Sequence, residues 1–86
     1  MKRDTDHTYT LILTVRNNPG VLVRCAQVFN RRGHNIEALH VGATPGSTPS
    51  SRMAITAFGN PKAIRQITMQ LRKLVDVISI AEENIV

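Results

Sequence analysis

The chain has 86 residues, 42% of them hydrophobic and 20% charged, and this ordinary globular composition excludes a mainly disordered polypeptide. Its first residues are polar, and no apolar run approaches the roughly 18 residues of a membrane-spanning helix, so we expect a cytoplasmic protein with no membrane partner. The single Cys25 excludes an internal disulfide and a cysteine-cluster metal site, and the net charge of +5 favours nucleic acid or an acidic protein surface as a partner.

Residues 1–7 are expected to form a flexible tail before a first strand over residues 8–16, where apolar and polar side chains alternate. Asn18 and Pro19 then predict a helix cap followed by proline at the first helical position, where its missing N–H costs nothing. Gly33 is expected to end this helix in the left-handed conformation. The predicted core stripe of the helix consists of apolar residues at helical spacing: Leu22, Cys25, Ala26 and Phe29, with Val28 beside them.

Three further strands are expected along the rest of the chain, over residues 35–43, 51–58 and 75–82. The segment 44–50, TPGSTPS, is rich in proline and hydroxyl residues and predicts a mobile hairpin loop. Asn60 and Pro61 repeat the cap-and-proline signal and predict the start of a second helix. The core stripe of this helix is expected to comprise Ile64, Ile67, Leu71 and Leu74.

The order strand, helix, strand, strand, helix, strand predicts a single α+β domain over residues 8–84 with the ferredoxin-like βαββαβ arrangement. Right-handed crossovers place both helices on one side of a four-stranded antiparallel sheet. The other side of the sheet is then uncovered, and this open face predicts a partner.

The basic residues concentrate on the two predicted helices: Arg24, Arg31, Arg32, Lys62, Arg65, Arg72 and Lys73. The acids lie in the tails and strands: Asp4, Asp6, Glu37, Asp76, Glu82 and Glu83. Two interpretations stay open, a solvated helix face and a docking surface for an acidic protein. RNA is less favoured, because RNA-recognition modules stack bases on aromatics of the central strands, and the third predicted strand offers only Phe58 at its end.

The segment 17–21 is a candidate site for a carboxylate or phosphate, because a helix N-terminus exposes unpaired N–H groups and a partial positive charge. Gly20 lets a ligand approach the backbone closely. Asn17 and Asn35 offer amide groups, but they flank opposite ends of the first helix. One chain therefore does not bring them around one small ligand, whereas two chains packed together can. The alternative is that both are ordinary turn or strand-edge amides.

No pattern in the sequence indicates catalysis or metal binding. The three histidines, at positions 7, 34 and 40, are scattered, and no paired carboxylates or activated hydroxyl groups are evident. Cys25 lies on the apolar helix face and is expected to be a buried structural thiol. One weak alternative comes from residues 20–24, whose Gly-Val-x-x-Arg pattern resembles the phosphate-binding loop of acylphosphatases.

Nearly the whole chain, roughly residues 8–83, resembles the regulatory small subunits of acetohydroxyacid synthase, also called acetolactate synthase. Four motifs carry the resemblance together: Asn-x-Pro-Gly-Val-Leu, Arg-Arg-Gly-x-Asn-Ile-Glu, Ser-Arg-Met and Gln-Leu-x-Lys-Leu-Val-Asp-Val. The resemblance implies an ACT domain, which is the version of this fold that senses small molecules.

The resemblance also implies regulation without chemistry in this chain. In the family, the small subunit activates a separate catalytic large subunit, which uses thiamine diphosphate, magnesium and FAD, and confers feedback inhibition by valine or a related branched-chain amino acid. The effector is expected between two ACT domains of a homodimer, held by Asn17, Gly20, Val21 and Leu22 of one chain and by Asn35 and Ile36 of the other. The alternatives are an ACT module that regulates another enzyme and a basic RNA-binding module.

Overall fold

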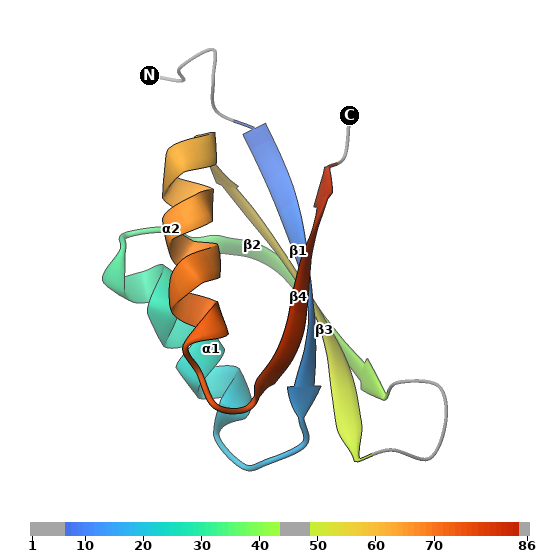
Figure 1. The fold of residues 1–86 in the computed structure, drawn as a ribbon. Coiled ribbons are helices and arrows are strands. Elements are labelled where there is room, and N and C mark those ends of the chain that lie inside the picture. The colour runs from blue at the N-terminus through green and yellow to red at the C-terminus, as the bar shows by residue number, and fades with distance from the viewer. Residues whose placement is uncertain (1–6, 44–48, 85–86) are drawn as a thin grey trace.

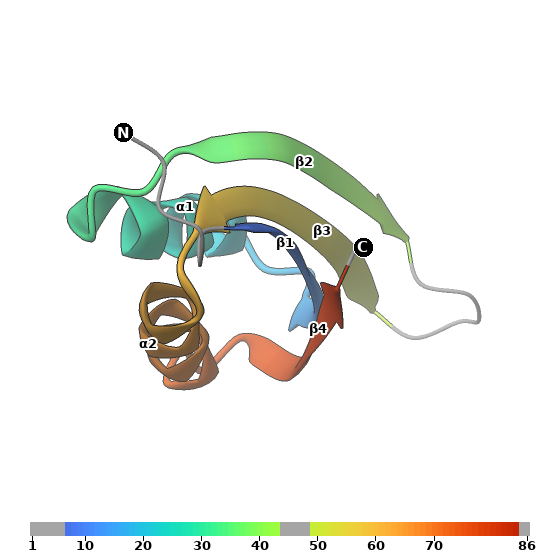
Figure 2. The same cartoon turned by 90° about the horizontal axis from the view of Figure 1, so that it is seen from above.

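The computed structural model describes residues 7–43 and 49–84. Its six elements follow the expected order: β1 (His7–Arg16), α1 (Val21–Arg31), β2 (Ile36–Ala43), β3 (Ser50–Gly59), α2 (Pro61–Arg72) and β4 (Val77–Asn84). The strands form one antiparallel sheet in the order β2-β3-β1-β4, and both helices lie on one face of it (Figure 1, Figure 2). The predicted ferredoxin-like α+β fold is confirmed.

The structure differs from the predicted boundaries at several ends. The first strand begins at His7 and the last begins at Val77, so Asp76 belongs to the turn before β4 and not to the strand. Most of the predicted tail and five residues of the predicted loop, 44–48, lie outside the described residues. The loop nevertheless joins a hairpin, because β2 and β3 pair as antiparallel neighbours.

The core lies between the helices and the central strands β1 and β3. Alternate residues of β1 face it, from Tyr9 to Val15, and they are paired in register with Met53, Ile55 and Ala57 of β3. The helices contribute their own buried stripes: Val21, Cys25 and Phe29 from α1, and Ile64, Ile67 and Leu71 from α2. On the uncovered face, the hydroxyl groups of Thr10 and Thr56 lie 3.1 Å apart and form a cross-strand hydrogen bond.

The expected core role of Leu22 is wrong, since 40% of this residue is exposed. The helix begins at Val21, so its stripe runs through Val21, Cys25 and Phe29 at intervals of four residues. Successive residues of a helix differ by about 100° around its axis, which turns Leu22 away from the core. Leu22 therefore remains available to a ligand or partner.

The end of α1 agrees with the prediction for Gly33, whose φ is 70°. The N–H of Gly33 donates to the carbonyl of Asn30, and the N–H of His34 donates to the carbonyl of Phe29. These two bonds form a Schellman motif, which satisfies carbonyls that the helix end would leave unpaired. Within the described ranges, α1 and α2 have 11 and 12 residues, and neither is long and apolar enough to cross a membrane.

Candidate functional site

The connection between β1 and α1 is a tight turn. The N–H of Val21 donates to the carbonyl of Asn18 over 3.3 Å, and Gly20 has φ 81° and ψ −5°. These angles match the third residue of a type II turn, a position that favours glycine because φ is positive. Pro19 takes the second position. The predictions that Asn18 caps the helix and that Pro19 is its first residue are therefore wrong.

The side chain of Asn18 has another partner, which explains why it does not cap the helix. Its Nδ2 donates to Oδ1 of Asp76 over 2.8 Å, and no side chain among the described residues caps α1. Asp76 is only 6% exposed, and its Oδ2 accepts from a guanidinium nitrogen of Arg24, also over 2.8 Å. A buried carboxylate needs such donors, because an unpaired charge away from water is very costly. The side-chain amide of Asn18, which the local sequence predicts to be the helix cap, thus binds the Asp76 carboxylate instead.

The N-terminus of α1 keeps donors available as a result. The N–H of Val21 closes the turn, but no acceptor for the N–H groups of Leu22 and Val23 is found in the described part of the chain. These groups lie at the positive end of the helix dipole. The arrangement therefore suits a small anion such as a carboxylate, with the backbone of Gly20 open to close approach.

The four predicted site residues at this end differ in what they offer. Asn17 is exposed, and its backbone N–H is anchored by the carbonyl of Pro49 over 3.2 Å. Val21 is 8% exposed and can contribute only its backbone, whereas the side chain of Leu22 is open. The guanidinium of Arg24 lies beside Gly20, 3.8 Å from where a Cβ on that residue would stand.

The two other predicted residues, Asn35 and Ile36, lie beyond the opposite end of α1 (Figure 1). Asn35 is exposed and lines a shallow pocket of about 330 Å³ between the end of α1 and the end of β3. Ile36 is partly buried and packs against the core. The helix between the two groups has 11 residues and spans roughly 16 Å, so one chain does not bring both groups to one amino acid.

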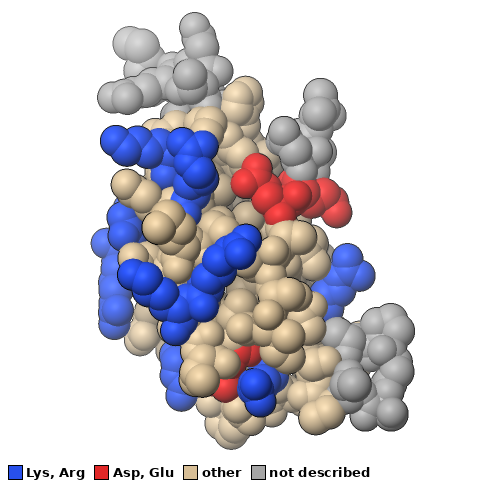
Figure 3. Space-filling view, in the orientation of Figure 1, with Lys and Arg blue, Asp and Glu red and all other residues tan. Residues whose placement is uncertain are grey.

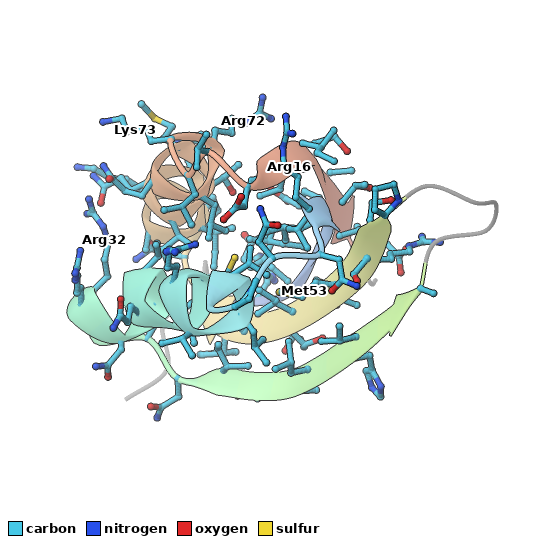
Figure 4. The ribbon with its side chains drawn as sticks, turned by 90° about the horizontal axis from the view of Figure 1, so that it is seen from below. Arg16, Arg32, Met53, Arg72 and Lys73 are labelled. Carbon is cyan, nitrogen blue, oxygen red and sulfur yellow. The ribbon has the colours of Figure 1, made fainter. Side chains whose placement is uncertain are left out.

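Further positive charge surrounds the candidate site and the helices. Figure 4 shows Arg16 beside β4 and Arg72 and Lys73 at the end of α2, all directed outward along one edge. Figure 3 shows Lys and Arg gathered over the helix layer. Between α1 and α2 lies a groove of about 500 Å³, in which Arg32 donates to Oε1 of Gln66 over 3.0 Å. The predicted basic helix surface is confirmed.

Groups with catalytic potential are sparse. Burial raises the pKa of the Cys25 thiol above its ordinary value, with the nearby negative charge of Asp76 acting in the same direction, so the thiol is a poor nucleophile at neutral pH. Its predicted burial is confirmed. The described residues contain no group of three or more His, Cys, Asp or Glu side chains that could hold a metal ion. The acylphosphatase-like pattern covers only residues 20–24, and one terminal nitrogen of its Arg24 guanidinium is already engaged by Asp76.

Sequence reasoning missed the structural role of Asp76 and its link to Arg24. A local signal existed, because Asp76 is the only charged residue in the apolar run Leu74–Ile78. A carboxylate inside such a run is usually paired when it is buried. Its partners could not be identified, since they lie 52 and 58 positions away along the chain.

Comparison with known proteins shows the family to which the chain belongs. Residues 11–79 match the model of the AHAS small subunit-like ACT domain. The acetolactate synthase small subunit of Mycobacterium leprae is 47% identical over 77 residues, which cover 90% of this chain and 45% of that protein. A probable acetolactate synthase small subunit of Archaeoglobus fulgidus is 45% identical over 74 residues, or 86% of this chain and 46% of that one. The chain thus spans about half the length of these curated relatives.

Solved structures agree with this assignment. The crystal structure of the acetolactate synthase small subunit from Thermotoga maritima has a TM-score of 0.79 and 36% identity, covering 88% of this chain and 47% of that chain. The ACT domain of a GTP pyrophosphokinase from Chlorobium tepidum has a TM-score of 0.76 at 17% identity, which is evidence for the fold alone. This chain belongs to the family of AHAS small subunit-like ACT domains.

Proposed function

We propose that this chain is a non-catalytic regulatory subunit that binds the catalytic large subunit of acetohydroxyacid synthase, activates it and makes it sensitive to a branched-chain amino acid. The observation that carries the proposal is the uncapped N-terminus of α1, where Gly20 and free backbone donors can receive a carboxylate. The membership of the chain in the family of AHAS small subunit-like ACT domains supports acetohydroxyacid synthase as the enzyme that it regulates. Thiamine diphosphate, magnesium and FAD would reside in the large subunit.

The effector site we propose is completed by a second copy of the chain. Asn17 and Leu22 lie at one end of α1 and Asn35 at the other, so an antiparallel pair of chains would bring unlike ends together. The effector carboxylate would lie at the α1 N-terminus, and the side-chain oxygens of Asn17 and the second copy's Asn35 would accept from its ammonium group. Leu22 would contact the apolar side chain.

Binding to the catalytic subunit is tested by co-purification and by the activity of the catalytic chain with and without this protein. We expect a stable complex and a higher rate. Titration with valine, leucine and isoleucine by calorimetry then tests the effector site, and analytical ultracentrifugation tests the dimer. If the complex forms but the amino acids give no heat of binding at millimolar concentration, the proposed effector site is contradicted and the proposed binding to the catalytic subunit is not.

Asn17→Ala separates regulation from docking. The exposed side chain of Asn17 makes no hydrogen bond recorded within the described part of the chain, so its loss should leave the fold intact. We expect feedback inhibition to disappear while activation of the catalytic subunit is retained, as measured by rate against effector concentration. Loss of both responses together would show that Asn17 serves docking or folding.

The basic helix layer favours an acidic surface on the large subunit as the docking site. Because the helices carry no Asp or Glu, reversing one exposed charge should slow association and reduce its salt dependence. We expect Arg65→Glu on α2 to raise the Kd for the catalytic subunit several-fold, whereas Arg52→Glu on the opposite sheet face should have little effect. Equal effects of both variants would exclude the helix layer as the docking surface.

If the large subunit does not bind, the alternative is an ACT module that regulates another enzyme. Calorimetry with the three amino acids still measures its sensing role. RNA binding finds little support, since Phe58 is the only aromatic residue of β3. A filter-binding assay with single-stranded RNA at two salt concentrations would test it.

A further inference from the structure

Asp76 differs from the other described acids in its burial and its position. It is 6% exposed, whereas Glu37, Glu82 and Glu83 are exposed. It lies in the turn that follows α2 and precedes β4, far along the chain from the candidate effector site. Both of its carboxylate oxygens accept a hydrogen bond of 2.8 Å, one from Asn18 and one from Arg24.

The contacts of Asp76 fall on both sides of the β1–α1 turn. Its backbone carbonyl accepts from the N–H of Arg16 over 2.7 Å, just before the turn. Its side chain then holds Asn18 inside the turn and Arg24 in the first turn of α1. One residue thus restrains the turn before, within and after Gly20, and it competes with the N-cap role that Asn18 would otherwise take.

The same carboxylate restrains the direction of Arg24. One terminal nitrogen of the guanidinium donates to Asp76, and the other lies 3.8 Å from where a Cβ on Gly20 would stand. Within the described residues, this second nitrogen donates no hydrogen bond. A carboxylate placed at Gly20 would therefore meet backbone donors together with a charged donor that is already held in position.

We propose that Asp76 is a positioning residue of the effector site, which keeps the Asn18–Gly20 turn in its ligand-ready form and holds Arg24 beside Gly20 as an additional contact for the effector carboxylate. The inference rests on the proposed function, because it concerns the same site. It adds Asp76 and Arg24 to the site, neither of which is among the six effector-binding residues that the family resemblance implies.

The test compares Asp76→Asn with Glu83→Gln, which removes one negative charge from exposed β4 without contact to the turn. Asparagine keeps the size of the side chain but replaces one carboxylate oxygen with an NH2 group, so either Asn18 or Arg24 then faces a donor and loses its hydrogen bond. By calorimetry with valine, leucine and isoleucine, we expect Asp76→Asn to weaken binding roughly tenfold, since a hydrogen bond to a charged group is lost. Glu83→Gln should bind as the wild type does.

A double-mutant cycle separates positioning from general destabilisation. If Asp76 acts through the turn, Asp76→Asn should weaken binding much less in an Asn18→Ala, Arg24→Gln background than in the wild type. Equal weakening in both backgrounds would overturn the proposal, as would wild-type or stronger affinity of a folded Asp76→Asn variant. Circular dichroism and thermal unfolding check that each variant is folded at the temperature of the titration.

Amide hydrogen exchange distinguishes failure of this inference from failure of the proposed function. We expect Asp76→Asn to speed exchange about tenfold at Val21 and Arg24, whose N–H groups donate to the carbonyls of Asn18 and Gly20, while the amides of α2 keep their rates. If the wild type binds no amino acid, the effector role is wrong. The exchange rates then still test whether Asp76 restrains the turn. Unchanged exchange at these amides would overturn the restraint itself.

Discussion

The two helices begin with the same dipeptide, Asn-Pro, and the structure uses it in opposite ways. At α2, Asn60 is the N-cap, its Oδ1 accepts from the N–H of Ala63 over 2.8 Å, and Pro61 is the first helical residue. At α1, Asn18 donates to Asp76, Pro19 stays outside the helix, and Gly20 takes the capping position, where no side chain in the described ranges makes a capping hydrogen bond. One helix start is closed by its own sequence, and the other is left open.

The difference teaches where this fold departs from local preference. A capped helix start stabilises the chain by satisfying a donor that would otherwise need water. The start of α1 forgoes that local stabilisation and instead depends on a residue contributed by another part of the fold. Departures of this kind concentrate at functional sites, and this one lies where the family resemblance places the effector carboxylate.

The largest loss of stability is expected from Asn18→Ala. It removes a donor from the buried carboxylate of Asp76, which should lower the free energy of unfolding by about 1.5–3 kcal/mol. Urea unfolding at fixed protein concentration measures this loss. The matched control is Asn17→Ala, whose exposed side chain should change stability by less than about 0.5 kcal/mol. Equal losses would show that the Asp76 contact contributes little.

A smaller loss is expected from Gly20→Ala, because alanine at φ 81° carries a backbone penalty of about 1–2 kcal/mol. The surrounding space does not oppose the methyl group, since the nearest atom is 3.8 Å away. Gly20→Asn should recover part of the loss, because asparagine tolerates the left-handed region. Gly33→Ala, with φ 70° and open space, provides the stability control and should cost a similar amount in thermal unfolding.

The smallest loss is expected from Asn60→Ala, which removes the cap of α2 and should cost about 1 kcal/mol. Asn60→Asp should restore it, since aspartate accepts the same hydrogen bond. We expect neither variant to alter the effector concentration that gives half-maximal inhibition. A change in that concentration would contradict the view that the open start of α1, and not the capped start of α2, takes part in regulation.

Much of the fold could be predicted from particular residues. Alternation in the first strand, the stripe from Ile64 to Leu71 and the Gly33 stop are local patterns, and each maps onto the expected element. The six candidate effector residues were assigned by resemblance and remain a prediction. The physical reading that they form two groups at opposite ends of α1 agrees with the structure.

Sequence alone determined the order of the elements and the closed start of α2, because their signals lie within a few residues of one another, and four motifs along the chain indicated the fold and the family. Only the tertiary structure decided that Asn18 binds Asp76 and that Leu22 faces outward. The Asn18–Asp76 contact joins residues 58 positions apart. Whether an asparagine caps its helix or binds elsewhere depends on which acceptor and donor groups the folded chain brings near it. A hydrogen bond to a buried carboxylate is stronger than one to a backbone N–H, so Asn18 binds Asp76.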